Sequence, residues 1–88
     1  MTLYRLEYRR GVEKEVRKLP TSARKNIVVA ILALAENPRP HGVTKLRGTE
    51  KTYRIRRGDY RIIYEIYDDR VVVEVIKIGR RRDVYRDS

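Results

Sequence analysis

The sequence predicts a small α+β domain with the element order β-α-α-β-β-β. Polar and apolar residues alternate near the start of the chain and again between residues 52 and 78, as in strands with one buried face. Between these segments, apolar residues recur at helical spacing. A chain of 88 residues is long enough for one core and too short for two. We therefore expect two helices packed on one face of a four-stranded, mainly antiparallel sheet.

The first half of the chain predicts one strand and two helices. Residues 3–8 alternate as in a strand, and the side chains expected to face the core are Tyr4, Leu6 and Tyr8. A first helix is predicted by apolar residues at positions i, i+4 and i+7, which are Val12, Val16 and Leu19. Pro20 ends this helix, and Thr21 or Ser22 can cap the next one. The second helix stops at Asn37-Pro38.

The second half predicts three strands joined by tight turns. The strands are expected at Thr52–Arg56, Tyr60–Tyr67 and Val71–Ile78. Arg57-Gly58-Asp59 and Asp68-Asp69 are typical of the turns between them. The last strand is apolar on both faces except for Glu74 and Lys77, so it should lie in the interior of the sheet.

Charge and composition narrow the class of partner. The formal net charge is +10, which favours nucleic acid or an acidic protein as partner. The chain has no cysteine, which excludes disulfides and thiolate metal sites. Its charged N-terminus is unlike a signal peptide, and no apolar run approaches the ~18 residues that span a bilayer. We therefore expect a cytoplasmic protein without a membrane partner.

Arginines are expected to gather on the sheet face that the helices leave open. Arg54 and Arg56 alternate with the apolar side of their strand and should project onto that face about 7 Å apart. Arg61 has the same orientation on the next strand. A planar guanidinium binds two phosphate oxygens at once, so this group could surround a phosphate. The alternative is a merely charged, solvated face that prevents strand aggregation.

Several motifs give the chain a resemblance to a known family. They are KLRG at residues 45–48, YRIRRGDYRIIY at residues 53–64 and GRRRDVY at residues 79–85. A KLP at residues 18–20 and an ENP at residues 36–38 fit the same pattern. Together they resemble the RelE toxins of the RelE/ParE superfamily, over nearly the whole chain. The resemblance implies a single RelE-like toxin domain over residues 1–88.

The resemblance also implies an activity. RelE toxins enter the ribosomal A site and cut the bound mRNA by attack of a 2′-hydroxyl on the neighbouring phosphate, without metal or cofactor. A RelB-like acidic antitoxin holds them inactive in a hetero-oligomeric complex. By position, the catalytic residues would be Arg54, Arg56, Arg61, Arg81 and Tyr85. Further contacts to RNA are expected from Lys45, Arg47, Arg57, Arg80 and Arg82.

The sequence supplies charge but no convincing general base. Some family members carry lysines where Arg54 and Arg56 stand, and arginine, with a pKa above ~12, cannot act as a base. His41, the only histidine, lies in a Pro/Gly connector away from the open face. Glu65 is expected to form an ion pair, and Asp83 to order the neighbouring arginines. Tyr85 is the candidate for the proton transfer, if nearby arginines lower its pKa.

Two other functions remain open from the sequence. The ParE branch of the superfamily shares the fold and inhibits DNA gyrase without catalysis. A basic RNA-binding module without chemistry would also carry this charge. The ParE branch does not require the arginine and tyrosine constellation that this sequence carries.

Overall fold

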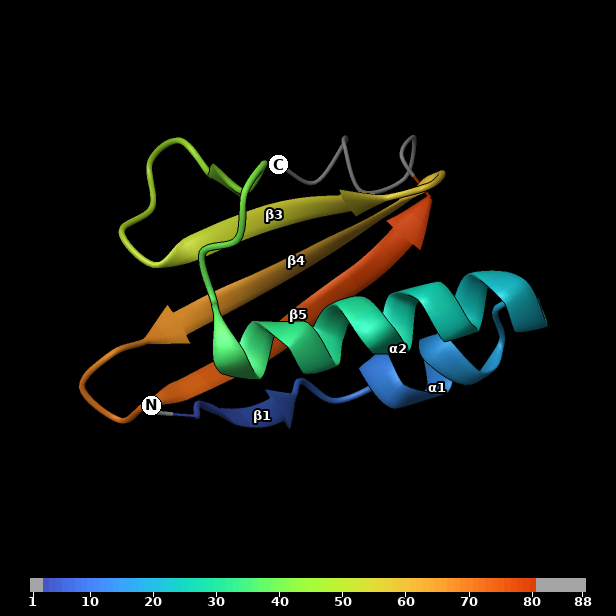
Figure 1. Cartoon of the computed structure of the whole chain (residues 1–88), viewed down its shortest axis with the longest axis horizontal. Helices are drawn as coiled ribbons and strands as arrows, with labels where there is room; N and C mark the ends of the chain where they lie inside the picture. Colours follow the sequence, from blue (N-terminus) through green and yellow to red (C-terminus); the bar gives the residue numbers. More distant parts are fainter. Residues whose placement is uncertain (1–2, 81–88) are drawn as a thin grey trace.

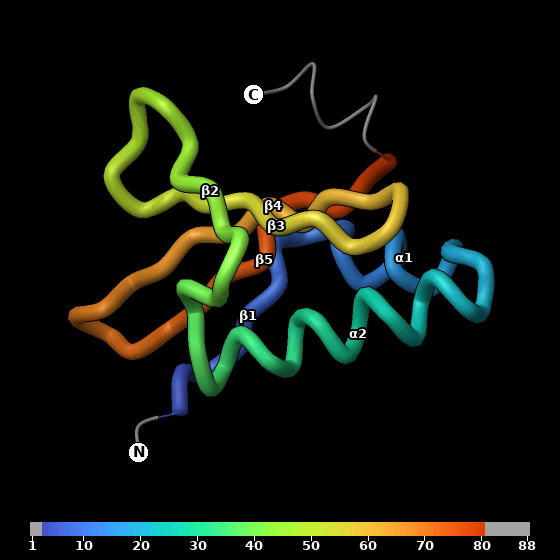
Figure 2. The backbone as a smooth tube through the Cα atoms, turned by 45° about the horizontal axis from the view of Figure 1, so that its top comes forward, coloured from blue at the N-terminus to red at the C-terminus, as the bar shows by residue number. Residues whose placement is uncertain are grey.

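The computed structural model describes residues 3–80, which form two helices and a five-stranded sheet (Figure 1). The elements are β1 (Arg5–Tyr8), α1 (Val12–Arg17), α2 (Thr21–Glu36), β2 (Thr44–Lys45), β3 (Thr52–Arg57), β4 (Tyr60–Tyr67) and β5 (Val72–Arg80). Both helices lie on one face of the sheet, as the sequence predicts, and no helix in the described range is long and apolar enough to cross a membrane (Figure 2).

The sheet has the strand order β1-β5-β4-β3-β2, with β1 parallel to β5 and every other pair antiparallel. It contains one strand more than the four that we expected. The additional strand, β2, has two residues, Thr44 and Lys45, which pair with Arg54 and Tyr53. Two residues are too few to produce an alternating pattern, so the sequence did not reveal this strand. The expectation that the last strand is interior is confirmed, because β5 lies between β1 and β4.

The core lies between the helices and the sheet. Helix α2 contributes the buried residues Ile27, Ala30, Ile31 and Leu34. They pack against the apolar sides of the inner strands, which include Ile55, Ile62, Tyr64, Val73 and Val75. The rings of Tyr53 and Tyr64 stack with their centroids 6.1 Å apart, and the Tyr64 hydroxyl donates to the Pro38 carbonyl oxygen at 2.7 Å. The buried tyrosine thus packs in the core while its polar atom is satisfied.

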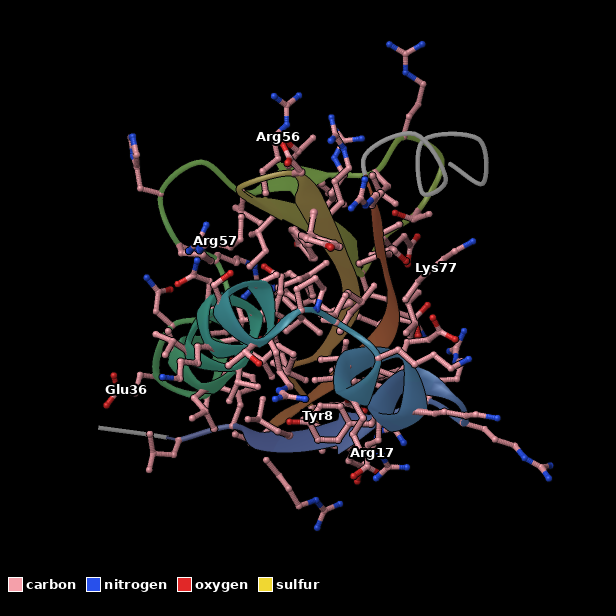
Figure 3. The ribbon with its side chains drawn as sticks, turned by 90° about the vertical axis from the view of Figure 1, so that its right-hand side faces the viewer. Tyr8, Arg17, Glu36, Arg56, Arg57 and Lys77 are labelled. Atoms are coloured by element: carbon pink, nitrogen blue, oxygen red, sulfur yellow. The ribbon has the colours of Figure 1, made fainter. Side chains whose placement is uncertain are left out.

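Two local expectations were wrong. Neither Thr21 nor Ser22 caps α2, because the helix begins at Thr21 with Pro20 in the preceding position, and no side chain donates or accepts a capping bond. Tyr8 was expected in the core but is 38% exposed. Its strand lies at the edge of the sheet, and the side chain borders a shallow hollow between α1 and α2 (Figure 3). The expected end of α2 is confirmed: the helix stops at Glu36, and Asn37 is extended before Pro38.

The turn and the bulge next to the open face set the direction of its side chains. The β3–β4 hairpin turns through Gly58 and Asp59, and Gly58 has φ +59°, the left-handed region that favours glycine at the first position of a type II′ turn. Strand β5 contains a bulge, because Ile63 pairs with Lys77 whereas Tyr64 pairs with Val75. Ile76 is the extra residue. Bulges redirect side chains and are frequent beside functional sites.

A polar network closes the opposite end of the molecule, where the N-terminal strand, the end of α2 and the β4–β5 turn meet (Figure 1). We call it the Asp68 network; its members are Tyr4, Arg39, Tyr53 and Asp68. Arg39 Nη2 lies 2.8 Å from Asp68 Oδ2, and the Tyr4 hydroxyl donates to Asp68 Oδ1 at 2.7 Å. Arg39 Nε donates to the Tyr53 hydroxyl at 3.3 Å. The network therefore joins four segments of the chain: the residue before β1, the connector after α2, β3 and the β4–β5 turn.

Candidate nucleic-acid interface

The strand register places three arginines together on the open face of the sheet. Arg56 of β3 lies directly opposite Arg61 of β4, and Arg54 lies opposite Ile63. Paired residues share a face, and Tyr53, Ile55 and Ile62 occupy the other face in contact with the helices. Arg56 projects from the sheet away from both helices (Figure 3). We call Arg54, Arg56 and Arg61 the arginine clamp.

The three clamp residues differ in burial. Arg56 is exposed and Arg54 is half-buried, whereas only 1% of Arg61 is exposed. Arg61 is therefore a positive charge beneath the surface, whereas Arg54 and Arg56 are accessible from solvent. Parity along the strand predicted the shared face, but it contains no information about depth. A charge held in a poorly solvated place acts more strongly on a nearby anion than one in bulk water.

No carboxylate of residues 3–80 lies within ion-pairing distance of Arg54 or Arg56. Surface arginines without carboxylate partners retain their donors for an external anion. The ion-paired arginines of the described range are Arg5 with Glu7, Arg9 with two glutamates, and Arg39 with Asp68. Positive charge without a carboxylate partner is therefore found on β3, at Arg54 and Arg56.

A cleft of about 730 Å³ extends from the clamp along β3 toward β2. Its cationic lining residues are Arg9, Lys45, Arg47, Arg54 and Lys77, and its apolar ones are Leu46, Ile63 and Ile76. Among the residues that line it, none is acidic and none is histidine. Lys45 and Arg47, expected to contact RNA, thus lie beside Arg54 of the clamp. Arg9 and Lys77 were missed, although the alternation of Arg5, Glu7 and Arg9 would have placed Arg9 on this face.

The structure separates two other predicted RNA contacts from the clamp. Arg57 pairs with Tyr60 on the helix side of the sheet, borders a hollow beside α2, and donates from Nη1 to the Arg56 carbonyl oxygen at 2.6 Å. Arg80 pairs with Tyr60 and lies with its guanidinium 5.9 Å from that ring. The remaining candidates, Arg81, Arg82 and Tyr85, together with Asp83, lie outside the described residues.

A row of glutamates crosses the open face next to the cleft. Glu65 of β4 and Glu7 of β1 are both register partners of Glu74 on β5. Arg9 Nη2 lies 3.4 Å from Glu65 Oε1 and 3.3 Å from Glu74 Oε1, so Glu65 forms the ion pair that was expected of it. The Tyr67 hydroxyl also donates to Glu65, and this bond raises the pKa of Tyr67. Glu65 thus accepts hydrogen bonds from neighbouring side chains and does not line the cleft.

Neither a histidine nor a metal-binding cluster of the described residues provides an alternative catalytic centre. His41 lies exposed in the connector between α2 and β2 and does not line the cleft. No cluster of histidine, aspartate and glutamate within residues 3–80 has a geometry suited to a metal ion. What the cleft presents is a cationic wall around an apolar floor, which suits an anion attached to an apolar ring.

Comparisons with known proteins agree with this geometry. The model of the family described as the ParE toxin of the type II toxin–antitoxin system parDE matches residues 6–85. The mRNA interferase toxin RelE of Escherichia coli is 35% identical, over 97% of this chain and 93% of its own length.

Solved structures give the same result. The E. coli RelBE toxin–antitoxin complex contains a chain with a TM-score of 0.77 and 34% identity, covering 88% of this chain and 95% of that one. The archaeal RelE–RelB complex of Pyrococcus horikoshii contains one with a TM-score of 0.80 and 32% identity, covering 92% and 97%. The chain therefore belongs to the RelE/ParE superfamily of type II toxins and is a RelE-type member of it.

Proposed function

We propose that this protein is the toxin of a type II toxin–antitoxin system and that it cleaves mRNA in the ribosomal A site. The observation that carries the proposal is the arginine clamp beside a cleft with no acidic lining residue, in a chain 35% identical to an mRNA interferase toxin. The substrate is single-stranded RNA, because the 2′-hydroxyl of RNA supplies the nucleophile. The reaction inhibits translation by destroying the message.

The clamp would act on the charge that develops at phosphorus. The 2′-oxygen forms a bond to phosphorus while the bond to the 5′-oxygen breaks, leaving a cyclic phosphate and a 5′-hydroxyl. The pentavalent intermediate carries additional negative charge on its free oxygens, which guanidinium donors stabilise. Arg54 and Arg56 reach the phosphate from β3, and the buried Arg61 supports them from β4. Stabilisation of this kind requires no proton transfer from the arginines.

Proton transfer is assigned to the end of the chain. The 2′-hydroxyl loses a proton and the leaving 5′-oxygen gains one, and residues 3–80 place no acidic residue or histidine in the cleft. Tyr85 is the candidate that would accept the proton, and Arg81 would join the arginines that contact the phosphate. A tyrosine surrounded by arginines has a lowered pKa, because neighbouring positive charge favours phenolate.

The ribosome supplies the remaining part of catalysis. A site with strong charge stabilisation and weak acid–base groups is slow on free RNA. Orientation of the attacking oxygen in line with the leaving oxygen contributes several kcal/mol when a reactant is held in place. The ribosome holds the A-site codon, so cleavage depends on translation. We therefore infer a cytoplasmic activity that is carried by a single toxin domain over residues 1–88.

The inhibitory partner is a RelB-like antitoxin. The structural relatives include RelB–RelE complexes from E. coli and P. horikoshii. The net charge of +10 suits an acidic antitoxin, and their association should be fast at low salt and slower at high salt. The two proteins would form a hetero-oligomer in which the arginine clamp is kept from the ribosome.

The proposal is tested by mapping mRNA ends after brief induction of the toxin. Primer extension should reveal breaks inside translated codons with wild-type protein and almost none with Arg56→Ala. Arg17→Ala is the matched control, because Arg17 is exposed on α1 at the far side of the molecule (Figure 3). If Arg56→Ala cleaved mRNA as well as Arg17→Ala does, the arginine clamp would have no role in the mechanism.

Gyrase inhibition is the second candidate, since the matching family model is described as a ParE toxin. A plasmid-supercoiling assay with purified gyrase separates the two functions. The proposed nuclease leaves supercoiling unchanged at concentrations that arrest translation. Inhibited supercoiling with intact mRNA would favour the ParE-like function.

A further inference from the structure

The cleft beside the clamp has a floor built from one row of register partners. Thr44 of β2, Arg54 of β3, Ile63 of β4 and Lys77 of β5 lie side by side across four strands. The bulge in β5 then brings Ile76 to the same cleft as Lys77, although consecutive strand residues normally point to opposite faces. Arg54 belongs both to the clamp and to this row, so the cleft begins where the clamp ends.

The cleft combines the two properties that a nucleotide requires. Leu46, Ile63 and Ile76 provide an apolar surface, and Ile63 is buried although it lies on the face away from the helical core. Cations surround this surface from β2, β3 and β5 and from Arg9, the residue that follows β1. The volume of about 730 Å³ falls within the range of small-molecule sites. A base can rest on the apolar floor while its phosphate meets the surrounding cations.

Arg9 forms the far wall of the cleft, and two carboxylates hold it there. Its Nη2 atom contacts both Glu65 and Glu74, while 49% of its side chain remains exposed. A guanidinium has five N–H donors, and Nη1 and Nε are not used in these contacts. Thr52 Oγ1 donates weakly to Glu65 at 3.4 Å, which helps to fix the carboxylate that positions Arg9.

Arg9 also separates the glutamate row from the cleft. The row of Glu7, Glu74 and Glu65 would repel a phosphate placed beside it. Arg9 lines the cleft and neither Glu65 nor Glu74 does, so a ligand meets the guanidinium rather than the carboxylates. Glu65 and Glu74 therefore orient the Arg9 guanidinium, and bound RNA would not extend past Arg9 toward these glutamates.

We infer that this cleft is a nucleotide subsite: it holds the nucleotide that flanks the cleaved bond, with the base over Ile63 and Ile76 and the phosphate contacted by Arg9. The inference rests on the proposed function, because the clamp defines which bond is cleaved. Arg9 is a binding residue of the substrate, and Glu65 and Glu74 are positioning residues that act through it.

The first test compares Arg9→Gln with Arg5→Gln in binding a short single-stranded RNA with a non-cleavable 2′-deoxy position. Arg5 is the matched control: it lies in β1, four residues before Arg9, and pairs with Glu7 at 2.9 Å, but it does not line the cleft. Loss of one phosphate contact should reduce the slope of log affinity against log salt by about 0.7. Arg9→Gln should show this reduction, and Arg5→Gln should keep the wild-type slope.

The second test uses ribosomes programmed with a synthetic mRNA. Arg9→Gln should lower kcat/KM on the order of tenfold, chiefly through KM, since one charge-assisted contact is lost. Arg9→Lys should recover part of the loss by keeping the charge. Glu74→Gln should produce a smaller loss of the same kind, whereas Glu7→Gln should leave KM unchanged. An abasic nucleotide next to the cleaved bond should reduce the difference between wild type and Arg9→Gln.

The outcomes distinguish this inference from the proposed function. Equal salt slopes and equal kcat/KM for Arg9→Gln and Arg5→Gln, with an active wild type, overturn the subsite and leave the nuclease in place. A wild type that cuts no mRNA overturns the nuclease, and the salt slopes alone then decide whether Arg9 contacts RNA phosphate.

Discussion

The arginine clamp and the Asp68 network contain the same type of residue in two different roles. In the network, Arg39 contacts a carboxylate at 2.8 Å and lies with its guanidinium 5.3 Å from the Tyr53 ring centre. On the open face, Arg54 and Arg56 have no carboxylate of the described range within reach. Arg39 thus joins segments of the fold, whereas the donors of Arg54 and Arg56 remain available to an external anion. The difference between Arg39 and these two arginines comes from their partners rather than from residue type.

The largest expected effect is on activity at the clamp. Arg56→Ala should reduce ribosome-dependent cleavage by about 100-fold or more, because it removes charge stabilisation at the reacting phosphate. Its midpoint of urea unfolding should stay close to that of the wild type, since the side chain is exposed. Measuring cleavage and the unfolding midpoint on one preparation tests whether Arg56 serves activity rather than stability. A large loss of stability with normal cleavage per folded molecule would contradict it.

Arg39→Ala should show the reverse behaviour. The pair with Asp68 is partly exposed, at 44% and 57% of the side chains, so solvent screening limits its contribution. We expect the free energy of unfolding to fall by about 1 kcal/mol, including the lost contact with Tyr53. Cleavage per folded molecule should be unchanged. Urea unfolding followed by a cleavage assay measures both, and Arg17→Ala serves as a control for loss of one surface charge.

The network should also make stability depend on acid. The hydrogen bonds from Arg39 and Tyr4 lower the pKa of Asp68 below its ordinary 3.8 in the folded protein. A lowered carboxyl pKa stabilises the fold above the ordinary pKa and loses that contribution as pH falls through the lowered value. The difference in unfolding free energy between wild type and Asp68→Asn should therefore be largest near neutral pH and disappear in strong acid. A difference that is constant across this range would exclude an ionised Asp68 as its origin.

The smallest expected effect is on the stability of the fold at alkaline pH. Burial raises the pKa of Tyr64 above the ordinary 10.0, because the phenolate would lose its hydration. Its contribution to stability is complete below pH 10 and declines as pH rises further. Spectrophotometric titration of wild type and Tyr64→Phe should show that the missing tyrosine is one that ionises late. If Tyr64 instead ionised at the ordinary tyrosine pKa, its surroundings would be more open to solvent than its core contacts imply.

Much of this fold could be predicted because it depends on local patterns. Alternation located β3 and β4, and an apolar run located β5, to within one or two residues, and Pro38 fixed the end of α2. The strand β2 could not be found, since two residues hold no period. The exposure of Tyr8 depends on which strand lies at the sheet edge, which the pattern of one strand does not encode.

The candidate site was predictable in outline and not in detail. Strand parity placed Arg54, Arg56 and Arg61 on one face, as the register has them. The burial of Arg61 and the contact of Arg9 with Glu65 and Glu74 depend on side chains brought together from separate strands. The bulge at Ile76, which brings two consecutive residues to the cleft, has no signal in an apolar run. Such features arise from the tertiary arrangement and required the structure.

The central claim is tested most directly in a reconstituted translation system of purified ribosomes, mRNA and toxin. The account predicts breaks within the codon in the A site, products ending in a cyclic phosphate, no cleavage when ribosomes are omitted, and a strong loss with Arg56→Ala but not Arg17→Ala. Equal cleavage of the same mRNA without ribosomes, or intact mRNA at toxin concentrations that arrest growth, would contradict it.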